Sequence, residues 1–379
     1  MKIGLLGFGT VGAGVYHIIS KQSELEVKYV LDLREFPELG GKLVHDYSVI
    51  LNDPEIETVV EVLGGLYPSF EFAVKAMEAG KNFVTANKHL VCHYFTELTE
   101  LAAKMGVAFR CTAAVGGGLP WLTSLERAKR VDKISEIWGI MNGTTNYILE
   151  TMRSSPVAFE KALSEAQALG YAEADPSADI DGLDIQRKVI ISSNIAFNCL
   201  LTEDDVPVFG IRGIRKEDID LFKQENVVCK LTANAMRIDD GVAAFVEPVL
   251  VPANEPDANV PSNFNLITFV GENVGRLSFY GQGAGRYPTA FNCVQDCVDI
   301  EKGVKDFYAD GLKACPVYND REEHYYYVRT SCPDKWLGEH MSKPMGPGVM
   351  THLVSVKEMH AWVKEKIKED PECFIAGIR

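Results

Sequence analysis

One short segment gathers the residue types that proton transfer requires. Residues 170–188 read GYAEADPSADIDGLDIQRK and place five acids before Lys188. Asp184 and Lys188 are spaced i, i+4, which puts them on one face of a helix, and Glu173 lies in the loop before it, where it can fold back over that helix. A carboxylate beside a lysine tunes that lysine and can hold a substrate ammonium or hydroxyl. The alternative is a loop whose acids favour a helix N-terminus, together with a surface ion pair.

A second segment, GFGTVG, has the pattern GxGxxG directly after a short apolar strand and at the start of a helix. Its glycines, Gly7, Gly9 and Gly12, would provide a tight turn, close approach of the backbone to a pyrophosphate, and close helix–strand packing. Thr10 and Val11 open the helix, whose free N–H groups favour phosphate. The pattern predicts dinucleotide binding, and the alternative is an ordinary glycine-rich turn.

Two residues bear on which dinucleotide is bound. Asp32 lies 20 residues beyond Gly12 at the end of the second expected strand, where an acid would accept from a ribose 2′-OH and favour NAD. Arg34 follows two residues later and would hold the 2′-phosphate of NADP instead. Both residues also fit a solvated strand end, so the sequence leaves NAD and NADP open.

Polar residues also follow two other expected strands. Residues 142–146, NGTTN, offer the amide of Asn142 and the hydroxyl of Thr144 to a polar small molecule; the alternative is a turn with a helix cap. Lys88 ends the segment TANK, and strand ends of this kind face the ligand crevice in open α/β sheets. Lys88 is therefore a candidate for the nicotinamide or substrate side, or else an exposed loop lysine.

The elements that must position these residues alternate in the first third of the chain. Apolar strands at 2–7, 26–31, 58–63, 82–85 and 107–111 are separated by helical patterns. This alternation predicts an α/β fold with a Rossmann-type, doubly wound parallel sheet.

Beyond a glycine-rich hinge at 114–120 the pattern changes. Helical segments (158–169, 182–197) mix with strand-like runs (135–141, 242–251, 266–270, 276–280), which predicts an α+β domain with a mixed sheet. A small β/α module is expected from about residue 322. We thus expect a dinucleotide-binding domain at 1–118, a substrate, catalytic and dimerisation domain at 119–284, a return segment packing on the first domain at 285–320, and a C-terminal module at 321–379.

Composition excludes several classes of function. The 379 residues carry a net charge of −15, which disfavours general nucleic-acid binding and anionic membranes. The nine cysteines include no CxxC pair, which argues against a zinc ribbon and a disulfide framework. Met1 runs directly into the strand-like KIGLLGFG, and the longest apolar stretches are broken by Ser and Asn. We therefore expect no leader or membrane span, and a reducing cytoplasmic location.

The motifs together resemble those of homoserine dehydrogenases. The matching pieces are GFGTVG, TANK, VGGGLP at 115–120, NGTTNYIL at 142–149, the segment 170–188, and GxG at 283–285. The resemblance implies reversible, NAD(P)-dependent interconversion of L-homoserine and L-aspartate 4-semialdehyde, in threonine and methionine biosynthesis, by a homodimer or higher homo-oligomer.

The same resemblance implies roles for individual residues. Lys188 would be the general acid/base for the hydroxyl proton. Glu173 and Asp184 would hold the substrate amino group and position that lysine. Lys88 would lie near the nicotinamide and substrate, and Gly170 and Gly285 would line the cofactor site.

The chain departs from the family pattern at one place that concerns a metal. Family members usually carry a glutamate three residues before the valine of VGGG, where it helps to form a sodium site with backbone carbonyls; here that residue is Thr112. The carbonyls of Val115, Gly117 and Leu119 would remain as Na⁺ ligands, but a threonine replaces the carboxylate poorly.

The tail is a second departure, because residues 321–379 resemble a shortened, degenerate ACT module, a domain that binds regulatory amino acids in relatives. We expect a structural or oligomerisation role, and sensing of an effector such as threonine is the alternative. Two alternative functions stay open: another amino-acid dehydrogenase on a related scaffold, such as one deaminating aspartate, and a catalytically silent dinucleotide sensor.

Overall fold

The computed structural model describes residues 1–304, 308 and 311–379, so part of the expected return segment at 285–320 lies outside the described residues. The chain divides into two compact units. The first comprises Met1–Val131, Asn194–Cys199 and Gln282–Lys313, and the second comprises Asp132–Ser193, Leu200–Gly281 and Ala314–Arg379.

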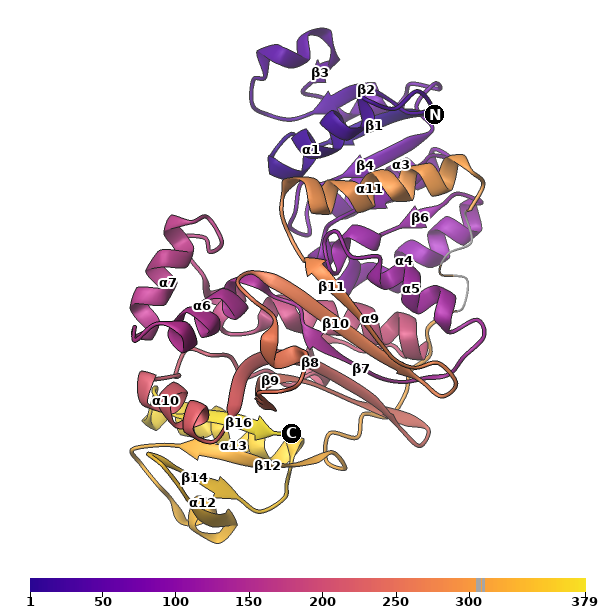
Figure 1. The fold of residues 1–379 in the computed structure, drawn as a ribbon. Helices are drawn as coiled ribbons and strands as arrows, with labels where there is room; N and C mark the ends of the chain where they lie inside the picture. Colours follow the sequence, from indigo (N-terminus) through magenta and orange to yellow (C-terminus); the bar gives the residue numbers. More distant parts are fainter. Residues whose placement is uncertain (305–307, 309–310) are drawn as a thin grey trace. The chain divides into compact units, whose positions relative to one another are not determined.

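The first unit is built on a six-stranded sheet of order β3-β2-β1-β4-β5-β6 (Figure 1). All of its strand pairs are parallel, which confirms the predicted doubly wound sheet. The strands are β1 (Lys2–Leu6), β2 (Glu26–Leu31), β3 (Leu43–Val44), β4 (Thr58–Glu61), β5 (Asn82–Thr85) and β6 (Phe109–Arg110). Every residue of β4 and β5 is buried, as expected for strands covered on both faces.

The helices of the first unit follow the strands in alternation, and a late helix joins them. They are α1 (Thr10–Ile19), η1 (Pro37–Lys42), α2 (Tyr47–Leu51), α3 (Ser69–Glu78), α4 (Lys88–Met105), η2 (Thr112–Ala114), α5 (Trp121–Ala128) and α11 (Arg286–Glu301). Figure 1 shows α11, in orange, among the indigo and purple elements of this unit. A Cβ added at Gly14 of α1 would lie 2.5 Å from the Arg286 carbonyl oxygen, so only glycine permits this close packing of α1 against α11.

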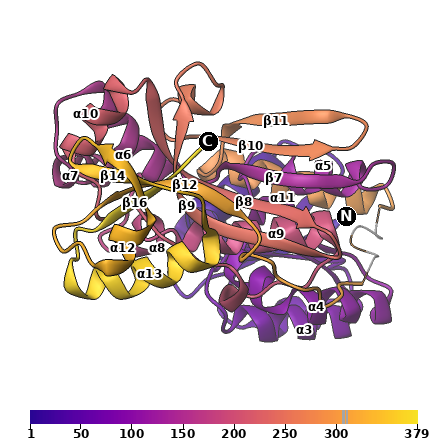
Figure 2. The same ribbon diagram turned by 90° about the horizontal axis from the view of Figure 1, so that it is seen from below.

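The second unit is built on a mixed ten-stranded sheet, as the sequence predicts. Its order is β11-β10-β7-β8-β9-β16-β12-β14-β13, with β15 paired to β12. The central strands are β7 (Ile134–Ile140), β8 (Val227–Ile238), β9 (Gly241–Pro252), β10 (Phe264–Gly271) and β11 (Gly275–Gln282). Figure 2 shows β7, β8, β9 and β10 side by side. Strand β8, which the sequence analysis did not predict, pairs antiparallel with both β7 and β9.

The helices of this unit before the C-terminal module are α6 (Gly143–Ser154), α7 (Phe159–Ala168), α8 (Ser177–Ile180), α9 (Leu183–Phe197), η3 (Glu203–Asp205), α10 (Lys216–Gln224) and η4 (Asp257–Asn259). The last residues of α9, from Asn194, belong to the first unit. Among the described residues, no helix combines the length and the apolar character needed to cross a membrane.

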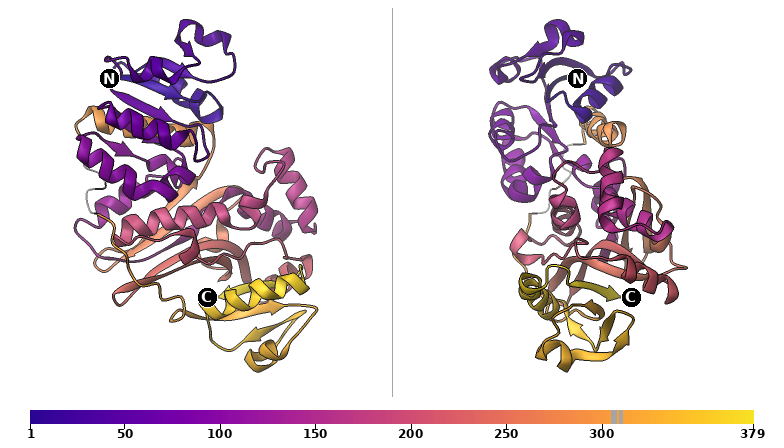
Figure 3. Two further views of the ribbon diagram at one scale, coloured as in Figure 1. Left: turned by 180° about the vertical axis from the view of Figure 1, so that it is seen from behind. Right: turned by 90° about the vertical axis from the view of Figure 1, so that its left-hand side faces the viewer.

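The C-terminal module continues the sheet of the second unit. It runs β12 (Glu323–Arg329), α12 (Lys335–His340), β13 (Met341–Met345), β14 (Gly348–Thr351), β15 (Val354–Ser355), α13 (Val356–Glu369) and β16 (Phe374–Ile378). Its strand order β16-β12-β14-β13, with a helix after β12 and another before β16, is that of a split βαβ, ferredoxin-like unit. Figure 3 shows this module in yellow. Leu337 of α12 and Met359 of α13 share its core with Tyr326.

The nine cysteines are of two kinds. Seven are free thiols, whereas Cys199 and Cys315 are disulfide-bonded. That bond corrects the expectation drawn from cysteine spacing, because residues distant in the sequence carry no local signature of pairing.

Candidate active site

The acid–lysine pair of the segment 170–188 lies on the buried face of α9. Asp184 is 5% and Lys188 7% exposed. Lys188 Nζ lies 2.7 Å from Asp184 Oδ2 and donates a hydrogen bond to the Met141 carbonyl at 2.6 Å. The spacing predicts that the two side chains share a helix face, and they do. Because both bonds converge on Nζ, the ammonium is held in one place, at the end of β7.

Asn142 links this pair to the polar segment 142–146. Its side chain caps α6, where Oδ1 accepts from the Thr145 backbone N–H at 2.9 Å. Its Nδ2 donates to Asp184 Oδ2 at 2.9 Å and to Asp179 Oδ1 at 2.7 Å. The sequence analysis named Asn142 and Asp184 separately, and the structure joins them in one buried network that also contains Lys188.

Thr144 and the loop before α8 form the edge of this network. Thr144 Oγ1 donates to the Tyr171 carbonyl at 2.5 Å, which ties the loop to α6. Gly170, which follows the C-cap of α7, has a φ of +74°, a conformation that favours glycine. Glu173 is exposed, in contrast to Asp184, and its carbonyl accepts from Gln167 Nε2 at 3.1 Å.

In the first unit, two glycines of the glycine-rich turn, Gly7 and Gly12, stand where a side chain would be strained or would clash. Gly7 has a φ of +98°, and a Cβ at Gly12 would lie 2.0 Å from the Gly7 carbonyl oxygen. Gly9 is the N-cap of α1, and Thr10 and Val11 form the first turn. The backbone and the open helix N-terminus thus fit a dinucleotide pyrophosphate.

At the end of β2, both carboxylate oxygens of Asp32 already accept hydrogen bonds. Its Oδ2 accepts from Phe8 N at 2.8 Å and from Arg34 Nη2 at 2.9 Å, and its Oδ1 accepts from Arg34 Nε at 3.0 Å. The hydrogen bonds from Arg34 lower the pKa of Asp32 to about 2. The Arg34 side chain itself is 64% exposed, so a cationic group stands beside the glycine-rich turn.

Glu61, which the sequence analysis did not single out, organises the ends of β4 and β5. Its buried carboxylate accepts from Leu63 N at 2.7 Å and Thr85 Oγ1 at 2.6 Å, and from Ser69 Oγ at 3.1 Å. Burial raises the pKa of Glu61. The available signal was an acid closing the otherwise apolar strand TVVE.

Lys88 lies immediately beyond this point, as the first residue of α4. Asn87 caps the helix by accepting from Leu90 N at 3.1 Å, and its Nδ2 donates to the Gly65 carbonyl at 2.6 Å. The cap therefore fixes the backbone from which the half-buried Lys88 side chain projects.

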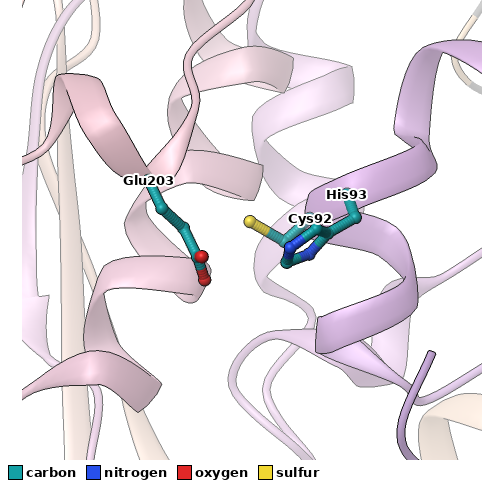
Figure 4. Close-up of side chains that lie close together, drawn as sticks. All are labelled: Cys92, His93 and Glu203. Carbon is teal, nitrogen blue, oxygen red and sulfur yellow. The ribbon is translucent and has the colours of Figure 1, made fainter.

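The next turn of α4 carries Cys92 and His93. Figure 4 shows Cys92 and His93 projecting from consecutive positions of this helix. The ring of His93 packs against that of His89, with centroids 4.8 Å apart. Glu203, also drawn in Figure 4, belongs to η3 of the second unit and accepts from Arg187 Nε at 2.7 Å.

The hinge loop at 115–119 is bonded to α11. Gly285, with a φ of +124°, is the N-cap of α11. The side-chain amide of Asn292 donates to the carbonyls of Gly117 and Leu119, at 2.5 and 2.8 Å. Two of the three carbonyls considered as Na⁺ ligands therefore already accept hydrogen bonds.

Comparison with known proteins adds to this geometry. Residues 120–298 match the family described as "Homoserine dehydrogenase", and residues 7–112 match "Homoserine dehydrogenase, NAD binding domain". A homoserine dehydrogenase of Lactococcus lactis subsp. lactis is 37% identical over 81% of this chain and 75% of its own length. One from Synechocystis sp. is 36% identical over 93% of this chain and 85% of its own length. The crystal structure of a homoserine dehydrogenase from Thiobacillus denitrificans superposes with a TM-score of 0.88 and 30% identity, over 100% of this chain and 98% of that one.

Proposed function

Because the chain belongs to the homoserine dehydrogenase family, we propose that Lys188 is the residue that moves the hydroxyl proton in its reaction. The enzyme is an NAD(P)-dependent oxidoreductase that interconverts L-homoserine and L-aspartate 4-semialdehyde, in threonine and methionine biosynthesis. The observation that carries the proposal is the buried Lys188 ammonium, fixed by Asp184 and the Met141 carbonyl.

When bound, the nicotinamide cofactor supplies or accepts the hydride. The contribution of Lys188 follows from the charge that develops on oxygen. Reduction of the aldehyde builds alkoxide character, which a fixed ammonium stabilises and protonates. In the direction of homoserine oxidation, the neutral amine of Lys188 takes the hydroxyl proton. Asp184 and the Met141 carbonyl keep Nζ in the required position in both directions.

The remaining polar groups of the second unit suit the substrate's amino-acid end. The exposed Glu173 carboxylate is the one offered to the substrate ammonium. Asp184 already bonds Lys188 and Asn142, so we assign it mainly to positioning the lysine. Asn142 and Thr144 hold the surrounding loop and present polar atoms to the substrate.

The cofactor-binding residues proposed for the first unit are the backbone of Gly7 to Gly12 for the pyrophosphate, Gly285 at the start of α11, and Lys88 for the nicotinamide side. Gly170 is proposed separately, as a cofactor-contacting residue of the second unit. We further propose a preference for NADP(H), because Asp32 is saturated by donors whereas Arg34 exposes a cation that can pair with a 2′-phosphate.

Substitution of Lys188 by alanine tests the proton-transfer role. We expect kcat to fall by about 10²- to 10⁴-fold, the usual contribution of a general acid/base, while NADPH binding, followed by fluorescence titration, is unchanged. Lys161→Ala, which removes an exposed lysine of α7, is the matched control and should keep full activity. A Lys188→Ala enzyme with the parent kcat would refute the role. A folded parent protein that binds NADPH but never turns over homoserine would instead favour the silent sensor.

Two coarser properties complete the proposal. A homodimer is supported by the sheet edge β11, which exposes Leu277 and Tyr280, and a mass by light scattering checks it. A cytoplasmic location is supported by the seven free cysteines, although Cys199 and Cys315 are disulfide-bonded.

For the C-terminal module we propose a structural role, since β16 pairs directly with β9.

A further inference from the structure

The side chain of Asn292 lies at the place where the family resemblance implies a sodium ion. It projects from α11, is 2% exposed, and donates from Nδ2 to the carbonyl oxygens of Gly117 and Leu119 at 2.5 and 2.8 Å. The amide and both acceptors belong to the first unit. The two carbonyls named as cation ligands therefore converge on a nitrogen donor.

An amide nitrogen and a cation exclude each other at such a point. The NH₂ group has two hydrogens, and both are used here. A hard cation takes oxygen ligands and would be repelled by the positive end of the N–H dipoles. Sodium could reach these carbonyls only if the Asn292 side chain withdrew, which would leave its buried NH₂ group without partners.

A second observation concerns Thr112, where relatives usually carry the charged ligand. Its backbone N–H donates to Asp296 Oδ2 at 3.0 Å and its hydroxyl to Asp296 Oδ1 at 2.7 Å. Arg110 Nε donates to the same Oδ1 at 2.9 Å. The charge of the Asp296 carboxylate is thus balanced by Arg110, and both of its oxygens accept hydrogen bonds. Thr112 adds no negative charge of its own.

We propose that this enzyme does not use sodium, and that the Asn292 amide takes over the structural task of the ion by tying the hinge loop 117–119 to α11. One neutral side chain satisfies the carbonyls that a cation would otherwise hold together. The inference concerns binding and stability of the first unit and does not depend on the catalytic roles proposed above.

Thermal unfolding of the parent protein in different salts is the direct test. A cation that binds only the folded state raises its stability by mass action, saturating with concentration. We expect the same melting temperature in NaCl, KCl and choline chloride at equal ionic strength, and the same NADPH affinity. A saturable rise in melting temperature with NaCl that KCl and choline chloride do not reproduce would overturn the proposal.

Asn292→Asp sharpens the test, because it changes the amide donor to a carboxylate of the same shape. Carboxylate oxygens facing two carbonyl oxygens repel them unless a cation lies between. We expect this variant to melt well below the parent in choline chloride and to recover with NaCl. Gln295→Glu makes the same chemical change at an exposed position of α11 and should show neither effect. An Asn292→Asp protein as stable as the parent in choline chloride would contradict the proposal.

Asn292→Ala keeps the proposal testable if the aspartate variant does not fold. It removes both hydrogen bonds without adding charge, so its melting temperature should fall more than that of Gln295→Ala. Equal melting temperatures for these two variants would show that the amide does not hold the loop.

Discussion

Two regions of the molecule, the proposed phosphate cradle of the first unit and the proposed proton-transfer network of the second, are built in opposite ways. The cradle is made of backbone and depends on the absence of a side chain at Gly12, where a Cβ would collide with the Gly7 carbonyl. The network is made of side chains that bond one another, because Asp184 accepts from both Lys188 Nζ and Asn142 Nδ2. A backbone cradle is therefore disrupted by adding a side chain, whereas a side-chain network is disrupted by removing one.

This difference predicts different kinetic signatures. Overcrowding of the backbone cradle should weaken cofactor binding and spare the chemical step. Loss of a partner in the side-chain network should slow the chemical step and spare cofactor binding. Substitutions at Asp184, Gly12 and Arg34 test this difference, and their expected effects decrease in that order.

Asp184→Asn should have the largest effect. The amide keeps the shape but removes the negative charge beside the buried Lys188 ammonium, so the charged lysine is disfavoured. We expect kcat to fall by about 10²- to 10³-fold, within the range of general acid–base catalysis. The pH profile of kcat should shift to lower pH on the limb that reports the essential acid, while the KM for the cofactor stays close to that of the parent.

Asp181→Asn is the control for this substitution. Asp181 lies at the end of α8, just before α9, and pairs with the exposed Arg212; exposed ion pairs contribute little. It should leave both kcat and the pH profile unchanged. If Asp184→Asn slowed the reaction without moving the pH profile, Asp184 would be holding the fold of the loop rather than the charge of Lys188.

Gly12→Ala should have an intermediate effect of the opposite kind. Overpacking typically costs about 1–3 kcal/mol, which corresponds to about a 5- to 150-fold loss in a binding constant. We expect the KM for the cofactor to rise by that factor, with kcat at saturating cofactor largely kept. Gly41→Ala is the control, since a Cβ there meets nothing within 4 Å. A fall in kcat at saturating cofactor would contradict the proposed separation of cofactor binding from the chemical step.

The two regions also differ in how far the sequence predicts them. Glycine spacing after an apolar strand is local, so the cradle and the parallel sheet around it are predictable. The i, i+4 spacing of Asp184 and Lys188 is local too. The bond from Asn142 to Asp184 spans 42 residues, and no periodicity encodes it. No local pattern predicts the contact of Glu61 either, whose carboxylate accepts a hydrogen bond from the Thr85 hydroxyl on a neighbouring strand.

Strand β8 shows why part of the mixed sheet was not predicted. Its sequence, VVCKLTANAMRI, places Lys230, Thr232 and Asn234 at alternate buried positions. Such residues argue against a core strand. Lys230 is tolerated because its Nζ donates to Asn146 Oδ1 at 2.8 Å and to the Val260 carbonyl at 3.0 Å, and burial lowers its pKa to about 8. The compensating partners come from distant parts of the chain.

The sequence pattern also does not predict the pairing of β16 with β9. Gly377 lies opposite Val249 in the register, so the last strand of the chain joins the middle of the sheet. The sequence analysis expected a small appended module, and fold class alone did not indicate that its hydrogen bonds would continue those of the second unit. Pairing between strands so distant along the chain depends on tertiary packing rather than on local pattern.

Arg34→Ala should have the smallest effect, because Arg34 lies beside the glycine-rich turn and is not part of its backbone. Loss of a cation that pairs with the 2′-phosphate should raise the KM for NADP⁺ by about tenfold, equivalent to 1.4 kcal/mol. The KM for NAD⁺ should stay constant or fall, because Asp32 loses its bonds from Arg34 and becomes free to accept from a 2′-OH. The measurement is the ratio of kcat/KM for the two cofactors.

Arg130→Ala, which removes another exposed arginine of the first unit, should leave that ratio unchanged. For Arg34→Ala, the direction in which the ratio of kcat/KM for NADP⁺ to that for NAD⁺ changes shows whether Arg34 selects the cofactor. An equal rise in KM for both cofactors would mean that Arg34 only holds Asp32 and the turn at Phe8 in place. A selective loss of NADP⁺ would show that a side chain at the rim chooses the cofactor, whereas the backbone beneath it binds the part that both cofactors share.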